Sequence, residues 1–255
     1  MFTLEVATGD ESYTLFLLGV GAVSLVAGAV AAVAGFGIGS ILTPVLALEA
    51  GLKLAVVAVG IPHFVGTLIR FWFLRRHLDR QVLMEFGIAS AVGGLAGALL
   101  HTRVSSPFLT FVFGGLLMLA GISELTGWMR RVHWAPAAAW IAGVLSGVFG
   151  GLVGNQGSIR TAALLGFRVP KESFVATATA VALLVDAARL PVYFASQGPA
   201  LIRLWPIVLV ATVAVGAGTV LGTRVLAWIP ERRFRTGVAL LLILLGLYMI
   251  AAGGA

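Results

Sequence analysis

The sequence predicts an all-α integral membrane protein in which two inverted repeats of five segments each form one membrane domain. Hydrophobic residues make up 60% of the 255 residues and charged residues only 11%, with a mean hydropathy of +1.06. Soluble domains carry roughly a quarter charged residues, so this composition excludes an exterior that faces water throughout. Long intervals without charge and an internal repeat, described below, complete the argument.

Apolar stretches bounded by charges, prolines and glycines divide the chain into ten expected helical segments. Two of them have only about ten residues, which at 1.5 Å per residue span about half of the hydrocarbon core. We therefore expect the second and seventh segments to be half-helices or re-entrant arms. In chain order the segments are 13–34, 41–51, 54–74, 81–100, 107–127, 136–153, 158–167, 172–195, 203–227 and 234–253.

The individual spans follow from where charge is absent. The interval between Glu11 and Glu49 contains the first segment and most of the second, and the residues after Arg235 contain most of the tenth. Further charge-free intervals contain most of the fifth, sixth and ninth segments. The first dozen residues include acidic residues but no Lys or Arg, unlike a secretory signal peptide, so we expect the first apolar segment to be a true span.

Lysine and arginine positions predict the orientation, because positive charge near span ends stays cytoplasmic. With the amino terminus outside, the cytoplasmic side receives twelve of the 17 Lys and Arg residues, Arg70 among them. The outside then receives three, and Arg160 and Arg189 remain within the membrane. The opposite orientation inverts this ratio, so both termini are expected outside.

The excess of basic over acidic residues is best explained by membrane topology. A net charge of +7 and a pI near 11.0 would suit nucleic acid only on a soluble surface, so we expect no nucleic-acid partner. The basic loops are expected to touch anionic lipid headgroups. The chain has no cysteine and no two histidines at metal-ligand spacing, so we expect neither a metal site nor a cofactor.

Part of the sequence in the first half of the chain is repeated in the second half. A shift of 118 positions places eight residues between 39 and 58 over identical residues between 157 and 176. Because each repeat then contains five segments, an odd number, the second half enters the membrane upside down relative to the first. We expect residues 1–127 to form one inverted repeat and residues 136–255 the other.

Each repeat has a glycine-rich loop before its short segment, GFGIGS at 35–40 and GNQGS at 154–158. Non-helical backbone at membrane depth is tolerated only where protein or a wet cavity satisfies its polar groups. The helices that follow would direct their positive amino ends at that cavity, which favours an anion. Neutral hydrogen-bond donors are expected from Ser40, Thr43, Asn155, Gln156, Ser158 and Thr161.

Glycines also let helices pack closely, so some of the glycines in the sequence are explained by packing rather than by a binding site. Gly35 and Gly39 form such a pair, so close packing remains a second interpretation of the first loop. We interpret five other glycines as packing residues only: Gly93, Gly97, Gly143, Gly218 and Gly222.

Arg160 lies one turn into the short seventh segment. An arginine at the centre of a membrane helix costs about 2.5 to 3.5 kcal/mol, so its charge must be compensated. A bound anion would do this. The alternatives are a structural pair with Glu172 or Asp186, or a side chain that extends to water.

Three other polar residues belong to the third and eighth segments. Asp186 and Arg189 stand three apart on one helix, which fits either an internal ion pair or a role in gating or proton coupling. Pro191 is expected to break that helix close to the pair. His63 could handle protons near neutral pH, or it could simply be a packing residue.

The two loop motifs and the sequences that follow them resemble those of a known family. The stretch GNQGSIRTAALLGF at 154–167, followed by VPKESFVATATAVALLVDAARLPVYF, resembles the TauE/SafE family of sulfite-exporter-like permeases, and the resemblance extends over essentially the whole chain. The first repeat, GFGIGSILTPVLAL at 35–48, departs from the family's all-glycine pattern at Ile38 and Ser40. The matching loop positions are Gly35, Gly37, Gly39, Pro44, Asn155, Gln156, Gly157 and Arg160.

The resemblance implies a multi-pass inner-membrane carrier of sulfur-containing anions such as sulfite, sulfonates or sulfoacetate. We therefore expect a secondary transporter that works by alternating access. A passive anion channel and a carrier of other small organic anions remain alternatives. An intramembrane enzyme is disfavoured, because Asp186 is the one clear carboxylate at membrane depth and chemistry would need a partner for it.

The expected site combines both loops with the polar residues nearby. Substrate binding is expected from Gly35, Gly37, Gly39, Ser40, Thr43, Pro44, Asn155, Gln156, Gly157, Ser158, Arg160 and Thr161. Gating or coupling is expected from His63, Asp186 and Arg189.

Overall fold

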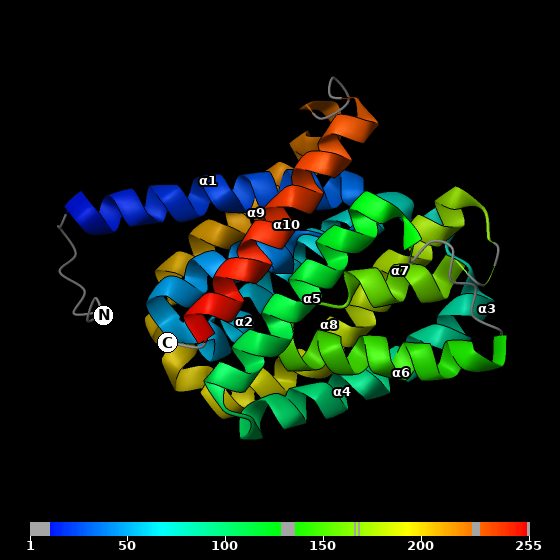
Figure 1. Ribbon diagram of the computed structural model, residues 1–255, viewed down its shortest axis with the longest axis horizontal. Coiled ribbons are helices and arrows are strands. Elements are labelled where there is room, and N and C mark those ends of the chain that lie inside the picture. Colours follow the sequence, from blue (N-terminus) through cyan, green and yellow to red (C-terminus); the bar gives the residue numbers. More distant parts are fainter. Residues whose placement is uncertain (1–10, 129–135, 166, 168, 226–229, 254–255) are drawn as a thin grey trace.

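The computed structural model describes residues 11–128, 136–165, 167, 169–225 and 230–253, and all regular structure within them is helical (Figure 1). The α-helices are α1 (Glu11–Ala34), α2 (Ile38–Leu74), α3 (Arg80–Val82), α4 (Ile88–Arg103), α5 (Ser106–Thr126), α6 (Pro136–Val153), α7 (Gly157–Leu165), α8 (Lys171–Arg203), α9 (Trp205–Val225) and α10 (Glu231–Gly253). A 3₁₀ turn (η1, Arg75–His77) follows α2, and a π-helical turn (η2, Leu83–Gly87) joins α3 to α4.

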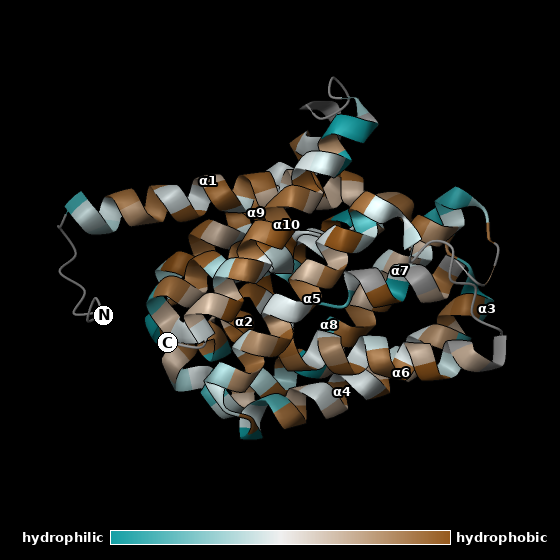
Figure 2. Cartoon of the chain, viewed as in Figure 1, coloured by the Kyte–Doolittle hydropathy of each residue, from teal (hydrophilic) through white to brown (hydrophobic). Residues whose placement is uncertain are grey.

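Seven helical stretches in the described part of the chain are long and apolar enough to cross a membrane. Many large apolar side chains on them face outward, for example Ile202 at 73% and Leu15 at 68% exposure. Such a surface suits lipid rather than water. Figure 2 shows apolar residues along most of the helices and hydrophilic residues mainly near their ends. The expected all-helical, multi-pass architecture is therefore confirmed.

The second and third expected segments form one interrupted helix. Gly51 breaks the helical geometry of α2 with φ 71° and ψ 156°, a conformation that glycine adopts readily. The arm before this kink begins at Ile38 and is short, and α7 has only nine residues. Both half-length segments therefore have the lengths expected of them.

The eighth helix differs from expectation. It runs without a break from Lys171 to Arg203 with Pro191 and Pro199 inside it, so the prediction that Pro191 breaks the helix is wrong. A proline removes one backbone hydrogen bond, and packing against neighbouring helices can hold a membrane helix together despite that loss. Here the hydroxyl of buried Tyr193, two residues further on, donates to the carbonyl of Gly151 on α6.

Close glycine contacts hold the helices together in pairs, with α1 beside α9, α4 beside α6 and α5 beside α10 (Figure 1). A Cβ added at Gly97 would lie 2.1 Å from the carbonyl oxygen of Val148, and one at Gly218 would lie 2.0 Å from that of Leu25. Close contacts of the same kind, with 3.0 Å or less from an added Cβ to the opposing backbone, occur at Gly93, Gly143 and Gly222. The five expected packing glycines are thus confirmed.

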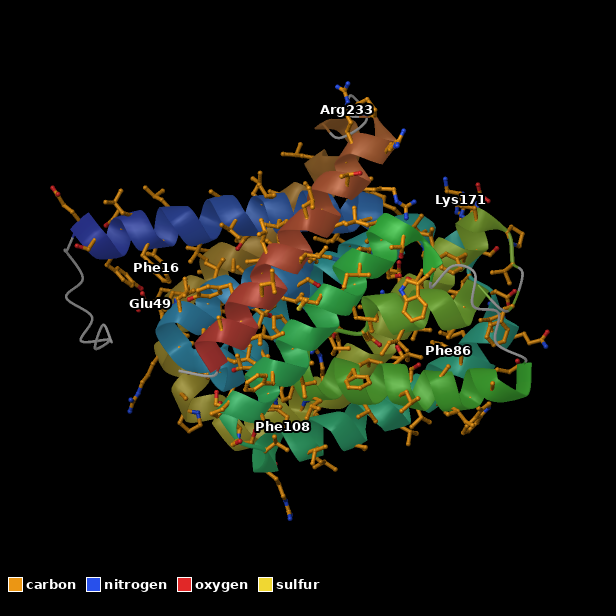
Figure 3. The ribbon with its side chains drawn as sticks, in the orientation of Figure 1. Phe16, Glu49, Phe86, Phe108, Lys171 and Arg233 are labelled. Carbon is orange, nitrogen blue, oxygen red and sulfur yellow. The ribbon has the colours of Figure 1, made fainter. Side chains whose placement is uncertain are left out.

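Two basic residues, Lys171 and Arg233, lie away from the start of α1 and the end of α10. Lys171 and Arg233 lie toward the upper part of Figure 3, whereas α1 begins and α10 ends toward its left.

Gly97→Ala should destabilise the protein strongly, because the new methyl group cannot fit against the α6 backbone. Overpacking of this kind costs about 1 to 3 kcal/mol. Thermal unfolding in detergent measures the effect. Gly115→Ala is the matched control, since nothing lies within 4 Å of a Cβ there and the helix should gain slightly. Equal unfolding midpoints for the two variants would contradict the packing role.

Candidate functional site

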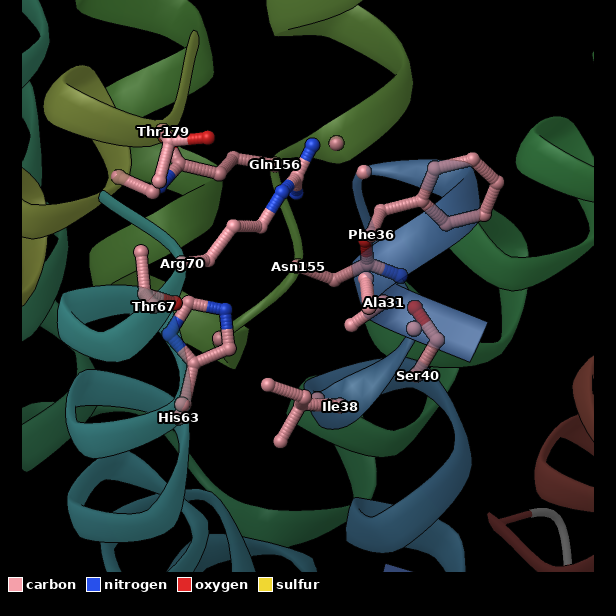
Figure 4. A pocket seen from close by; sticks show the side chains of 18 of the residues that line it. Ala31, Phe36, Ile38, Ser40, His63, Thr67, Arg70, Asn155, Gln156 and Thr179 are labelled. Atoms are coloured by element: carbon pink, nitrogen blue, oxygen red, sulfur yellow. The ribbon is translucent and has the colours of Figure 1, made fainter. Parts of the chain in front are cut away.

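The two glycine-rich loops meet at a cavity inside the molecule (Figure 4). Its lining comes from the end of α1, both loops, the starts of α2 and α7, the later part of α2, the first half of α8 and the second half of α9. Three glycines in the loops have positive φ, with values of 87° at Gly35, 137° at Gly37 and 74° at Gly154. Side chains rarely adopt that conformation, so the glycines let the chain turn sharply into the short helices.

The loops touch each other directly. A Cβ added at Gly39 would lie 2.8 Å from the carbonyl oxygen of Gly154, and one added at Gly157 would lie 2.9 Å from Cβ of Phe36. Residues 39 and 36 correspond to residues 157 and 154 under the shift of 118 positions, so the same contact occurs twice. Both short helices therefore begin at one cavity.

The helix starts leave backbone donors available there. The first N–H groups of a helix have no partner within it, and Gly37 has no side chain to cap those of α2. Ile38, Gly39 and Ser40 of α2 and Gly157 of α7 all line the cavity. The arrangement favours a negatively charged ligand.

Arg160 adds a full positive charge to this lining. Its side chain is only 5% exposed, and Nη2 donates to the carbonyl oxygen of Gly35 at 3.4 Å. Nε is buried without a hydrogen-bond partner, and the described contacts of Arg160 include no ion pair with Glu172 or Asp186. The structural pair considered from the sequence is thus not formed.

Sequence analysis missed a second cationic residue, Arg70. It was counted among the charges of the cytoplasmic side, yet it lies on α2 and lines the cavity. Its Nη2 atom lies 3.2 Å from the position of a Cβ added at Gly35, and its Nε is buried without a partner. A shift of 119 rather than 118 positions would have found it, because that shift pairs Arg70 with Arg189 and Gly35 with Gly154.

Neutral polar groups complete the lining. Asn155 is 7% exposed and its Nδ2 has no hydrogen-bond partner, while Oε1 of Gln156 accepts from Ser146 at a long 3.5 Å. Thr67, Thr179 and Thr219 also line the cavity, and sequence analysis did not single them out. Figure 4 shows His63, Thr67 and Arg70 on one helix, with Ile38 and Ser40 across from them.

Some expected site residues lie beside the cavity without lining it. Thr43 and Pro44 are buried in α2 about one turn past Ser40, and Thr161 is half-buried in α7. Ser158 belongs to α7, but its side chain lies outside the described part of the chain.

His63, Asp186 and Arg189 form one connected group next to the cavity. His63, which lines it, has Nδ1 2.7 Å from Oδ2 of Asp186, and Arg189 donates from Nε to Oδ1 of Asp186 at 2.9 Å. Arg189 also donates from Nη1 to the carbonyl of Gly150 at 2.9 Å. The two oxygens of Asp186 thus each have a partner, and the expected Asp186–Arg189 ion pair is present.

The cavity has the chemistry of an anion site rather than of a metal site. Its lining includes Arg70 and Arg160 but no aspartate or glutamate. Within the described ranges, no three His, Cys, Asp or Glu residues lie close enough together to hold a metal ion.

The fold is that of a multi-pass membrane protein with an internal cavity. The family model described as sulfite exporter TauE/SafE matches residues 20–249, and the chain belongs to this family of transporters, which are not enzymes. No curated protein and no solved structure matches the chain.

Cysteine labelling tests whether the cavity is reached by water and by anions. The chain has no native cysteine, so Ile38→Cys and Gln156→Cys each place one thiol in the lining. A membrane-impermeant thiol reagent should modify both, and methanesulfonate, which does not react with the reagent, should slow the reaction several-fold. Leu42→Cys, fully buried one turn further along α2, is the control that should stay unlabelled. Unreactive thiols at both lining positions, or labelling unaffected by anions, would contradict an anion cavity.

Proposed function

We propose that this protein is a secondary transporter that moves small sulfur-containing oxyanions, of the sulfite, sulfonate or sulfoacetate type, across the inner membrane by alternating access. The observation that carries the proposal is the cavity at which both short helices begin and into which Arg160 brings an unpaired charge. Membership of the sulfite exporter TauE/SafE family supports the same substrate class.

Anion binding follows from the charges and donors in the lining. A guanidinium group offers several N–H donors in a fixed plane, which suits the oxygens of a sulfite or sulfonate group. Asn155 and Gln156 add amide groups, and the helix starts add backbone N–H groups. We propose that these groups, with Gly35, Gly37, Gly39, Ser40 and Gly157, contact the substrate, and that Thr43, Pro44, Ser158 and Thr161 support the helix starts.

Reciprocal contacts support the two inverted repeats proposed for residues 1–127 and 136–255. Gly218 packs on the backbone of Leu25, and Gly93 packs on the backbone of Val144. Leu25 and Val144 are 119 positions apart, and Gly93 and Gly218 are 125 apart. In both cases a glycine of one proposed repeat packs on the backbone of the other, which is the kind of reciprocal contact that a two-fold relation would give. Rocking of two such halves about a central site is the usual basis of alternating access.

The distribution of charge supports termini outside the cell. Lys171 and Arg233 belong to the predicted cytoplasmic set, and they lie away from the start of α1 and the end of α10 (Figures 1 and 3). This separation is what the positive-inside rule requires.

We also propose that the group formed by His63 and Asp186 couples anion movement to protons. His63 lines the cavity and its ring is 2.7 Å from Asp186, so gain or loss of a proton there would change the charge beside a bound anion. Arg189 on α8 and Arg160 on α7 are the other charged residues that act on Asp186.

Arg160→Gln should lower anion transport at least about tenfold, because a hydrogen bond to a charged group contributes about 1.5 to 3 kcal/mol. Counterflow of radiolabelled sulfite in proteoliposomes measures this, and a passive channel would show neither exchange nor saturation. Arg103→Gln, an exposed arginine at the end of α4, is the control. Normal transport by a correctly inserted Arg160→Gln protein would reduce Arg160 to a structural role.

His63→Gln should keep counterflow but lose stimulation by an inward proton gradient, because glutamine cannot take up the proton. Uptake with and without an imposed pH difference measures the effect. His77→Gln, which changes an exposed histidine in η1, should behave like the unaltered protein. Gradient-driven uptake that persists in His63→Gln would exclude a coupling role for this residue.

A further inference from the structure

We propose that Arg70 is a substrate-binding residue and that Arg70 and Arg160 together make the cavity selective for doubly charged oxyanions. This inference rests on the proposed function and adds to it the charge of the substrate. Its basis is a difference between two arginines, one in each half of the protein.

Arg70 and Arg189 occupy equivalent places in the two halves. They are 119 positions apart, as are Gly35 and Gly154, and each guanidinium lies against the glycine of its own half. The distances from an added Cβ are 3.2 Å to Nη2 of Arg70 and 3.1 Å to Nη1 of Arg189. The scaffold therefore holds two arginines in the same local setting.

The partners of these two arginines differ. Arg189 is paired with Asp186, at 2.8 Å between Nη2 and Oδ1, three residues before it in α8. The residue three before Arg70 is Thr67, which is neutral and lines the cavity. No hydrogen bond or ion pair of Arg70 is present among the described residues, and its buried Nε is unsatisfied. The charge of Arg189 is thus balanced by a carboxylate, whereas, within the described part of the chain, the charge of Arg70 is not.

Arg160 is the second such charge, and the two share one cavity. Its Nε is also unsatisfied, and Asp186, the nearest carboxylate that acts on it, already has a partner on each oxygen. A singly charged anion would leave one buried guanidinium uncompensated, whereas a doubly charged anion would balance both. A second charge-assisted contact strengthens binding by about ten- to a hundred-fold.

The size of the cavity limits the dianion to a small one. Its volume is about 40 Å³, which is room for roughly three water molecules. A compact oxyanion of the size of sulfite or sulfate comes closest to this volume. In an extended disulfonate the two charges would lie too far apart to share this cavity.

Sulfate and methanesulfonate test the proposal, since they have similar size and geometry and differ by one negative charge. Their binding to the purified full-length protein is measured by isothermal titration in detergent at constant ionic strength. The unaltered protein should bind sulfate at least about tenfold more tightly than methanesulfonate. Arg70→Gln should lose most of that preference while still binding methanesulfonate, and Arg70→Lys should recover part of it.

Arg76→Gln is the matched control, because Arg76 is exposed just beyond the end of the same helix and should leave the preference unchanged. Thermal unfolding without any anion gives an independent readout. Arg70→Gln should raise the unfolding temperature, since it removes an unbalanced charge, whereas loss of a purely structural arginine would lower it.

The outcomes separate the two proposals. If neither anion binds the unaltered protein, the proposed function fails. If both anions bind the unaltered protein alike, or if Arg70→Gln keeps the preference for sulfate, the proposed function stands and the assignment of Arg70 is wrong.

Discussion

Two buried arginines that lack a carboxylate partner among the described residues set the main constraint on this membrane domain. Arg70 and Arg160 line one cavity that contains no acidic side chain, and each has a buried Nε without a partner. Charge in this setting is costly, so it persists where a ligand or a mechanism requires it. The glycine-rich loops, the short helices and the tight helix pairs can all be understood as the means of building such a cavity within lipid.

Glycine provides the geometry that the charge needs. At Gly35 and Gly154 positive φ values turn the chain into the short helices, and at Gly39 and Gly157 the missing side chains let the two loops touch. In the surrounding helices, glycines such as Gly97 and Gly218 bring backbones together closely enough to enclose the site. The same residue type thus shapes the cavity and closes the protein around it.

The two proposed repeats differ in the partners of their arginines. Equivalent glycine loops hold Arg70 in one half and Arg189 in the other, yet only Arg189 has a carboxylate beside it. Asp186 also contacts His63 from the first half, so the second half contributes a polar network where the first contributes a free charge. The proposed anion site and the proposed proton-coupling group therefore lie next to each other.

The sequence by itself determined the membrane class, the family, the approximate spans, the two half-length segments and most of the loop residues at the cavity. These features follow from local hydropathy and glycine patterns, which the chain carries wherever it folds. Only the tertiary structure decided that α8 continues through Pro191, that His63 on α2 contacts Asp186 on α8, and that Arg70, counted with the cytoplasmic charges, lines the cavity. These three features depend on which helices pack against each other. A charged residue near the end of a span has the same sequence pattern whether its side chain faces water or the protein interior.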